Sequence, residues 1–302
     1  MASAIPQTVL QERIAAAYRL LESCHVCPRE CGVNRLKDDK IGFCRSGLNP
    51  VVSSASAHLG EEPPLSGTKG SGTIFLTNCT LRCVYCQNYP ISHLGHGEEK
   101  TPGELACQMV WLREQGCHNL NLVTPTHFMP QILKALGIAK ERGFDLPIVY
   151  NTNGYETLEA LRILDGIVDI YLPDMRYSDE AVARKYSVAP YYPEINRAAV
   201  KEMFRQVGNL VVDEKGIAKK GLIIRHLVLS NGLSGTEEVM RFLAEEVSRD
   251  VYISLMAQYF PAYKAMEYKE LSRRITHDEY EDARSIMEKY GLENGWMQEN
   301  EL

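Results

Sequence analysis

Residues 73–88 read TIFLTNCTLRCVYCQN, and this stretch decides both the fold and the chemistry of the chain. It begins with a short apolar run, TIFLT, of the kind that forms a buried strand. Cys79, Cys83 and Cys86 follow directly, in a C-x3-C-x2-C pattern. Three thiolates at this spacing can bind three corners of an iron–sulfur cubane and leave the fourth iron free for chemistry. A zinc knuckle or a chance spacing is the alternative.

After this stretch, strand-like apolar runs alternate with segments of helical periodicity, which is typical of repeated βα units and a parallel sheet. The sequence predicts strands at residues 73–77, 120–124, 147–151, 167–172, 222–229 and 251–256. Capping boxes predict helices that begin after Thr101 and Ser234. Six βα units are too few to close an eight-stranded barrel. The predicted fold class is therefore α/β, a partial (βα)6 barrel with its chemistry at the C-terminal ends of the strands.

The chain is expected to have two parts. The boundary is the Pro- and Gly-rich stretch before the first predicted strand. Residues 1–69 contain an amphipathic helix and a four-cysteine metal-binding segment. Residues 70–302 form the partial barrel with a C-terminal helical extension.

Four further cysteines gather in the N-terminal part: Cys24, Cys27, Cys31 and Cys44. A closed site of four thiolates is most often structural zinc. An auxiliary 4Fe–4S cluster is one alternative, favoured by the proline directly after Cys27 and by the second cysteine motif. Ordinary buried thiols are the other. Both metals accept tetrahedral thiolates, so the spacing leaves zinc and iron open. Either metal centre would hold residues 22–45 together, because this segment is too rich in glycine and charge to form a core alone.

Composition excludes a disordered or collagen-like chain. The 302 residues include 45% hydrophobic and 24% charged residues, which predicts a globular chain. No apolar run is long enough for a membrane span and no signal peptide is visible, so we expect a cytoplasmic protein without disulfides or a membrane partner. The net charge is −6 and basic runs are short, which does not indicate nucleic acid as a partner.

The cysteine motif after the first strand of a partial barrel resembles that of the radical S-adenosylmethionine superfamily. More narrowly, the chain resembles the pyruvate formate-lyase activating enzyme-like subfamily over nearly its whole length. The segments that carry the narrower resemblance are PPLSG at 63–67, GSGT at 70–73, NLVTPTH at 121–127, YNTNGY at 150–155 and YLPD at 171–174.

This resemblance implies a cofactor and a reaction. Cys79, Cys83 and Cys86 would hold a 4Fe–4S cluster whose open iron binds the amino and carboxylate groups of S-adenosylmethionine. One electron from a low-potential donor such as flavodoxin or ferredoxin would then release methionine and a 5′-deoxyadenosyl radical.

The resemblance also implies cofactor-binding residues at the strand ends. They are Tyr85, Thr124, Thr126, Asn151, Thr152, Asp174, Arg176 and His226, where Thr124 and Thr126 stand in place of the relatives' Gly-Gly-Glu-type turn and are candidates to accept the hydrogen bonds of the cofactor's amino group. In the relatives, acidic residues at the positions of Asn151 and Asp174 help to bind a monovalent cation, which makes such a cation a candidate ligand. Arg176 is expected to pair with the methionyl carboxylate, with a surface ion pair between Asp174 and Arg176 as the alternative. A satisfied core histidine is the alternative for His226.

Two adjacent acidic residues, Glu61 and Glu62, lie in the predicted boundary loop. We expect them to be solvated loop charges, with a role on the substrate side as the alternative.

Three functional hypotheses follow. The first is an activating-type enzyme that abstracts a glycine α-hydrogen from a partner protein. The second keeps the radical chemistry but acts on a small molecule, a peptide or an RNA base. The third is a non-catalytic iron–sulfur or zinc module, and the three-cysteine site argues against it, because an electron carrier is better served by a saturated cluster.

Overall fold

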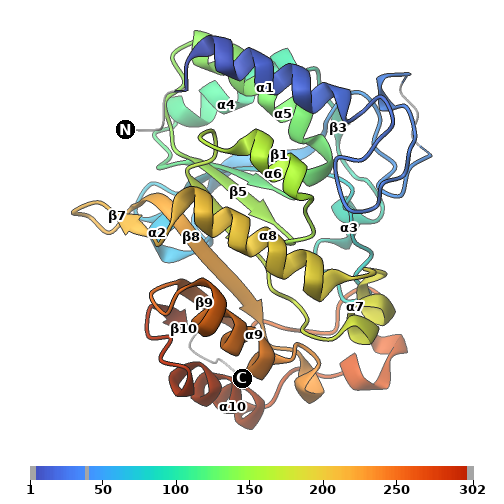
Figure 1. Cartoon of the computed structure of the whole chain (residues 1–302), viewed down its shortest axis with the longest axis vertical. Coiled ribbons are helices and arrows are strands. Elements are labelled where there is room, and N and C mark those ends of the chain that lie inside the picture. The colour runs from blue at the N-terminus through green and yellow to red at the C-terminus, as the bar shows by residue number, and fades with distance from the viewer. Residues whose placement is uncertain (1–4, 38–40, 298–302) are drawn as a thin grey trace.

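The computed structural model describes residues 5–37 and 41–297, and its centre is a parallel sheet (Figure 1). The parallel strands, in spatial order, are β2 (Ser71–Leu76), β4 (Leu120–Val123), β5 (Ile148–Thr152), β6 (Ile170–Pro173), β8 (Ala218–Leu227) and β9 (Tyr252–Met256). All six strands predicted from the sequence are thus confirmed, with ends shifted by a few residues. The predicted α/β class and partial barrel are confirmed with them.

Four further strands extend the sheet beyond the prediction. They are β1 (Val51–His58), antiparallel to β2; β3 (Glu98–Glu99), antiparallel to β1; β7 (Val211–Val212), antiparallel to β8; and β10 (Gly295–Met297), parallel to β9. The boundary predicted at residue 69 falls between β1 and β2. Both predicted parts therefore contribute to one sheet.

Most of the helices lie on the outer side of the sheet, whereas α2 (Pro63–Ser66) lies on its concave face (Figure 1). The helices are α1 (Gln7–Arg19), α2, α3 (Tyr89–Ser92), α4 (Pro102–Glu114), α5 (Met129–Glu141), α6 (Leu158–Leu164), α7 (Glu180–Ser187), α8 (Tyr192–Val207), α9 (Thr236–Phe242) and α10 (His277–Lys289). Short 3-10 turns lie at Arg35–Lys37, Thr126–Phe128, Ser230–Gly232, Ala265–Glu267 and Lys269–Leu271, and a π turn lies at Leu243–Val247. Within the described chain, no helix is long and apolar enough to cross a bilayer.

The two predicted capping boxes have different outcomes. The box at Thr101 forms, with Glu104 bound to the backbone of Thr101. The box at Ser234 does not form. Instead, α9 begins after Gly235, which has a φ of 64°, a left-handed value that suits glycine.

The segment before β2 fills one end of the sheet's concave face. Leu65 on α2 is fully buried against apolar side chains of the parallel strands, among them Val149 and Ile223. Side chains two residues apart on a strand point to the same face. Asn151 and Arg225, two residues further along these strands, therefore also point to the concave face. The apolar end of this face lies under α2, and its polar end lies at the C-terminal ends of the strands.

Candidate active site

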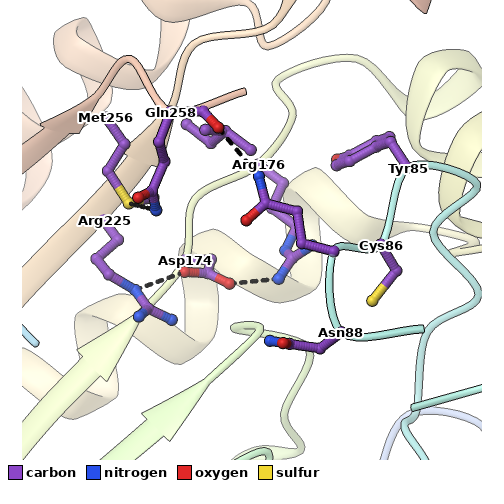
Figure 2. A pocket seen from close by; sticks show the side chains of 10 residues that line it. Tyr85, Cys86, Asn88, Asp174, Arg176, Arg225, Met256 and Gln258 are labelled. Atoms are coloured by element: carbon purple, nitrogen blue, oxygen red, sulfur yellow. Dashed lines mark hydrogen bonds and ion pairs between the residues drawn. The ribbon is translucent and has the colours of Figure 1, made fainter. Parts of the chain in front are cut away.

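The C-terminal ends of the parallel strands border a cavity of about 360 Å³ that is partly open to solvent. Its lining includes Cys79, Cys83, Cys86, His93, Thr124, Asn151, Thr152, Asn153, Asp174, Arg176, Arg225 and Gln258. A smaller pocket shares Cys86, Asp174 and Arg176 with it and adds Tyr85 and Met256 (Figure 2). The structure therefore brings most of the predicted cofactor-binding residues together with the three cysteines. They meet at the C-terminal ends of the strands, where the chemistry of a partial barrel was expected.

The three cysteines of the loop after β2 are surrounded by hydrogen-bonding groups. The groups within reach of sulfur are Asn153 Nδ2 at 3.4 Å from Cys79, Arg176 Nη1 at 3.3 Å and Ser187 Oγ at 3.0 Å from Cys83, and Ser92 Oγ at 3.1 Å from Cys86. Burial raises the pKa of the Cys86 thiol to about 12, so a metal has to displace a proton to bind there. Three thiols on one loop, facing one cavity and close to cationic and polar donors, fit a 4Fe–4S cluster with an open iron.

A buried carboxylate between two guanidinium groups forms the floor of this site. Asp174 Oδ1 accepts a hydrogen bond from Arg225 Nε at 2.9 Å, and Asp174 Oδ2 accepts one from Arg176 Nη2 at 2.5 Å (Figure 2). Burial favours the neutral acid, but the charges of Arg225 and Arg176 outweigh burial and lower the pKa of Asp174. Since Arg176 also reaches Cys83, this ion-pair network continues into the cysteine loop.

Glu61 extends the network on its other side. Its Oε2 accepts hydrogen bonds from Asn121 Nδ2 at 2.6 Å and Asn151 Nδ2 at 3.1 Å, and its Oε1 lies 3.7 Å from Arg225 Nη1. Glu62 is buried and accepts a hydrogen bond from Trp296 Nε1. The expectation that these two residues are solvated loop charges is wrong, because their loop turns into the concave face.

Arg225 binds both Asn151 and Asp174, the two residues at which the family resemblance implies a monovalent cation. Its Nη2 donates to Asn151 Oδ1 at 2.7 Å while its Nε donates to Asp174. A guanidinium group therefore lies between Asn151 and Asp174.

Two cavity-lining polar atoms lack a partner among the described residues. Arg176 Nε is buried and unpaired, and so is His93 Nε2. His93 Nδ1 lies 2.8 Å from Ser92 Oγ, which in turn contacts Cys86. Burial, and then the nearby arginines, lower the pKa of His93 to about 4, so the ring is neutral at pH 7. Sequence reasoning missed His93, since it lies in the turn directly after α3 with no distinguishing pattern around it.

Tyr85, the aromatic residue of the motif, belongs to a chain of hydroxyl groups. Its hydroxyl lies 2.5 Å from that of Tyr177, which lies 2.7 Å from Ser187 Oγ, the group that donates to Cys83. The rings of Tyr85 and Tyr259 also pack edge to face. This aromatic wall shields the cysteine loop from solvent on one side.

Thr124 lines the cavity with a strained backbone. Its φ is 58°, an unusual value for a β-branched residue. Its N–H donates to Asn151 O at 2.9 Å, which ties the end of β4 to β5. Such strain persists only where the surroundings impose it, and it is common at ligand sites.

Thr126 and Thr152 form hydrogen bonds to a buried carboxyl group, that of Glu156. Both hydroxyl groups donate to Glu156 Oε1, and Thr126 does so at 2.5 Å. Thr152 still borders the cavity, whereas Thr126 is buried away from it. Burial raises the pKa of Glu156 to about 7 despite these hydrogen bonds.

His226 lies outside the cavity lining. Its Nδ1 is 2.7 Å from Met175 O and its Nε2 is 3.0 Å from Thr236 Oγ1, so both ring nitrogens are satisfied within the protein. Burial lowers the pKa of His226 to about 4. The structure favours the alternative of a core histidine.

The fold and the site define a radical enzyme of the S-adenosylmethionine-dependent type. The family model of the radical SAM superfamily matches residues 73–208. The uncharacterized protein MJ0674 of Methanocaldococcus jannaschii is 33% identical over 300 residues, covering 96% of this chain and 81% of that protein. The uncharacterized protein MJ0808 of the same organism is 25% identical over 287 residues, covering 85% of this chain and 78% of that protein. The chain belongs to the radical SAM superfamily, which implies a 4Fe–4S cluster and S-adenosylmethionine.

A solved structure has a similar fold. The crystal structure of Streptococcus suis SuiB bound to S-adenosylmethionine aligns with a TM-score of 0.52 at 11% sequence identity. The alignment covers 74% of this chain and 49% of SuiB, so this chain spans about half the length of SuiB. The likeness concerns the fold alone.

The raised pKa of Glu156 predicts a pH-dependent stability. Folding favours the protonated carboxyl, so its contribution to stability is complete below the ordinary pKa of 4.5 and is lost as the pH rises through about 7. Relative to the wild type, Glu156→Gln should gain up to about 3 kcal/mol in free energy of unfolding between pH 5 and pH 8. Thermal unfolding of the anaerobic, metal-loaded protein at several pH values measures this difference.

Glu279 provides a control of opposite sign. Hydrogen bonds from Arg273 lower the pKa of Glu279 to about 2. Its contribution to stability is therefore present above pH 4.5 and is lost as the pH falls through 2, so Glu279→Gln should destabilise the protein more at pH 7 than at pH 3. A Glu156→Gln difference that stays constant with pH would contradict the assignment.

Proposed function

We propose that this protein cleaves S-adenosylmethionine reductively and uses the resulting radical to abstract hydrogen, in the manner of an activating enzyme that installs a glycyl radical on a partner protein. The observation that carries the cleavage is that Cys79, Cys83 and Cys86 face one cavity together with the Arg176–Asp174–Arg225 network. When bound, the cluster and S-adenosylmethionine supply a 5′-deoxyadenosyl radical after one electron is delivered by a flavodoxin- or ferredoxin-class donor.

The chain's own residues bind and orient the cofactor in this proposal. The unpaired Arg176 Nε points to a carboxylate ligand, since a buried N–H without an acceptor is costly and a guanidinium binds carboxylates well. Asp174 and Cys83 hold two other nitrogens of the same guanidinium, which fixes its plane. The methionyl carboxylate is the acceptor that this arrangement fits.

Arg225 replaces a bound cation in this proposal. Its guanidinium already contacts both Asn151 and Asp174, and it is neutralised by Asp174 and Glu61. A second positive charge between these residues would meet repulsion in a buried site. We therefore infer that Arg225 supplies the positive charge that the relatives take from a monovalent cation.

Exposed aromatic and apolar side chains beside the cavity support a protein substrate. Tyr263 stacks on Tyr89 at a centroid distance of 5.0 Å and lies 4.7 Å from the ring of His93, which lines the cavity. Phe260 and Met266, on the same segment after β9, are exposed. Clustered exposed apolar residues are typical of a surface that binds another polypeptide.

The first prediction from this proposal concerns the cluster ligands. Cys83→Ala should lower 5′-deoxyadenosine formation by at least about a hundredfold, because the cluster loses one of its three thiolates. Cys107→Ser is the matched control, since Cys107 is exposed on α4 outside the cavity. The assay uses anaerobic protein reconstituted with iron and sulfide, with dithionite as the reductant. Full cleavage by Cys83→Ala would refute the assignment.

A second prediction concerns the cation. Wild-type cleavage of S-adenosylmethionine should proceed at the same rate in potassium, sodium or tetramethylammonium buffers. Arg225→Ala should lose about tenfold in rate and regain part of it when potassium is added, because the small ion can enter the space left by the guanidinium. A wild-type requirement for potassium or sodium would contradict the role of Arg225.

A third prediction concerns the substrate. Co-purification from the source cells should yield a partner protein that acquires a glycyl-radical doublet in electron paramagnetic resonance when this enzyme, S-adenosylmethionine and a reductant are supplied. The doublet should be absent with the Cys83→Ala variant. Cleavage without a doublet on any bound protein would favour a small molecule, a peptide or an RNA base as the substrate.

A further inference from the structure

Two carboxylates line the cavity, and their surroundings differ. The acidic side chains of the lining are those of Glu61 and Asp174. Asp174 accepts hydrogen bonds on both oxygens, from Arg225 on Oδ1 and from Arg176 on Oδ2 (Figure 2). Both oxygens of Asp174 are therefore already engaged by positive charges that belong to the protein.

Glu61 keeps one oxygen available to a ligand. Its Oε2 accepts hydrogen bonds from Asn121 Nδ2 at 2.6 Å and from Asn151 Nδ2 at 3.1 Å. Its Oε1 accepts none from the described residues. Arg225 Nη1 lies 3.7 Å from Oε1, which is longer than a hydrogen bond. Because each oxygen of a carboxylate can accept two hydrogen bonds, Oε1 can still bind a donor or a cation that enters the cavity.

The loop that carries Glu61 is fixed from both sides. Ser66 Oγ donates to Glu61 O at 2.9 Å, and Ser66 N donates to Glu62 O at 3.0 Å. The Glu62 side chain accepts hydrogen bonds from Ser254 Oγ at 3.1 Å and from Trp296 Nε1 at 2.6 Å, and it does not line the cavity. The Glu61 side chain is 10% exposed. Its carboxylate is thus held in position before a ligand enters.

The formal charges of the acidic and basic side chains in the lining sum to zero. Arg176 and Arg225 are positive, and Asp174 and Glu61 are negative. Four further cysteines lie outside this lining: Cys24, Cys27, Cys31 and Cys44.

S-adenosylmethionine has a carboxylate and a permanently positive sulfonium. In the proposed function, Arg176 Nε binds the carboxylate. The sulfonium then needs a negative charge, because an unbalanced charge in a largely buried site is costly. Since both oxygens of Asp174 are engaged, Glu61 is the carboxylate of the lining that can balance it.

We propose that Glu61 supplies the negative charge that balances the sulfonium of S-adenosylmethionine in this cavity. Arg176 and Glu61 then bind the two charged parts of one ligand with groups of opposite sign, and this orients the ligand. The proposal rests on the proposed function in the identity of the ligand. It gives a role in cofactor binding to the loop before β2, beside those of the strand ends.

Ligand binding in the absence of a reductant tests the role of Glu61. S-adenosylhomocysteine is the matched probe, because it has the same amino-acid and adenosine parts but a neutral thioether in place of the sulfonium. Glu61→Gln removes the negative charge and keeps an oxygen that can accept from Asn121 and Asn151. This variant should bind S-adenosylmethionine about tenfold more weakly than the wild type and bind S-adenosylhomocysteine within about twofold of it. Equilibrium dialysis of anaerobic protein reconstituted with iron and sulfide measures both dissociation constants.

Glu62→Gln is the matched control, because Glu62 lies in the same loop outside the cavity lining, and both of its constants should stay within about twofold of wild type. Glu61→Asp keeps the charge on a shorter side chain and should bind S-adenosylmethionine more tightly than Glu61→Gln does. Equal losses for the two ligands in Glu61→Gln, no loss for either, or equal affinities of Glu61→Asp and Glu61→Gln would overturn the role of Glu61 alone. A wild type that binds neither ligand would refute the proposed function as well.

Discussion

The arrangement of the concave face depends on one buried carboxylate. Moving a lone charge out of water costs several kcal/mol, so Asp174 can stay ionised at 6% exposure only because Arg225 and Arg176 bind its two oxygens. Each buried arginine in turn needs that carboxylate to balance its charge, and each also fixes the position of further groups. Arg225 fixes Asn151 and approaches Glu61, and Arg176 reaches Cys83. Groups from β5, β6, β8, the loop before β2 and the cysteine loop are thus held by one set of charges.

The parts of the structure that local patterns encode were predictable. The six parallel strands are short and apolar because both of their faces are covered, and a buried strand has this composition wherever it occurs. The grouping of Cys79, Cys83 and Cys86 follows from their spacing alone. The partial barrel then places Asn151, Asp174 and Arg176 beside them, because the ends of parallel strands meet at one edge of the sheet.

The parts that depend on distant contacts were not predictable. Glu61 binds Asn121 and Asn151, which lie 60 and 90 residues later in the chain, and nothing in its own loop indicates those contacts. Arg225 and His226 are consecutive residues of β8, and neighbours on a strand point to opposite faces, so only one of them can reach the cavity. Once Arg225 is placed next to Asp174, His226 has to lie in the core. Thr126 is a similar case, because its hydroxyl is bound by Glu156, whose position is set by the turn after β5.

The hydrogen bond between Glu62 and Trp296 joins residues separated by 234 positions in the chain. Glu62 is synthesised well before its partner on β10, because the two residues lie 234 positions apart. Glu61, Glu62 and α2 therefore lack the contact with Trp296 while the intervening strands are synthesised and paired. Contacts of such large separation are slow to form. The contact that joins the loop before α2 to β10 is consequently made after the intervening strands, and the cysteine loops are synthesised before the cavity beside them is complete.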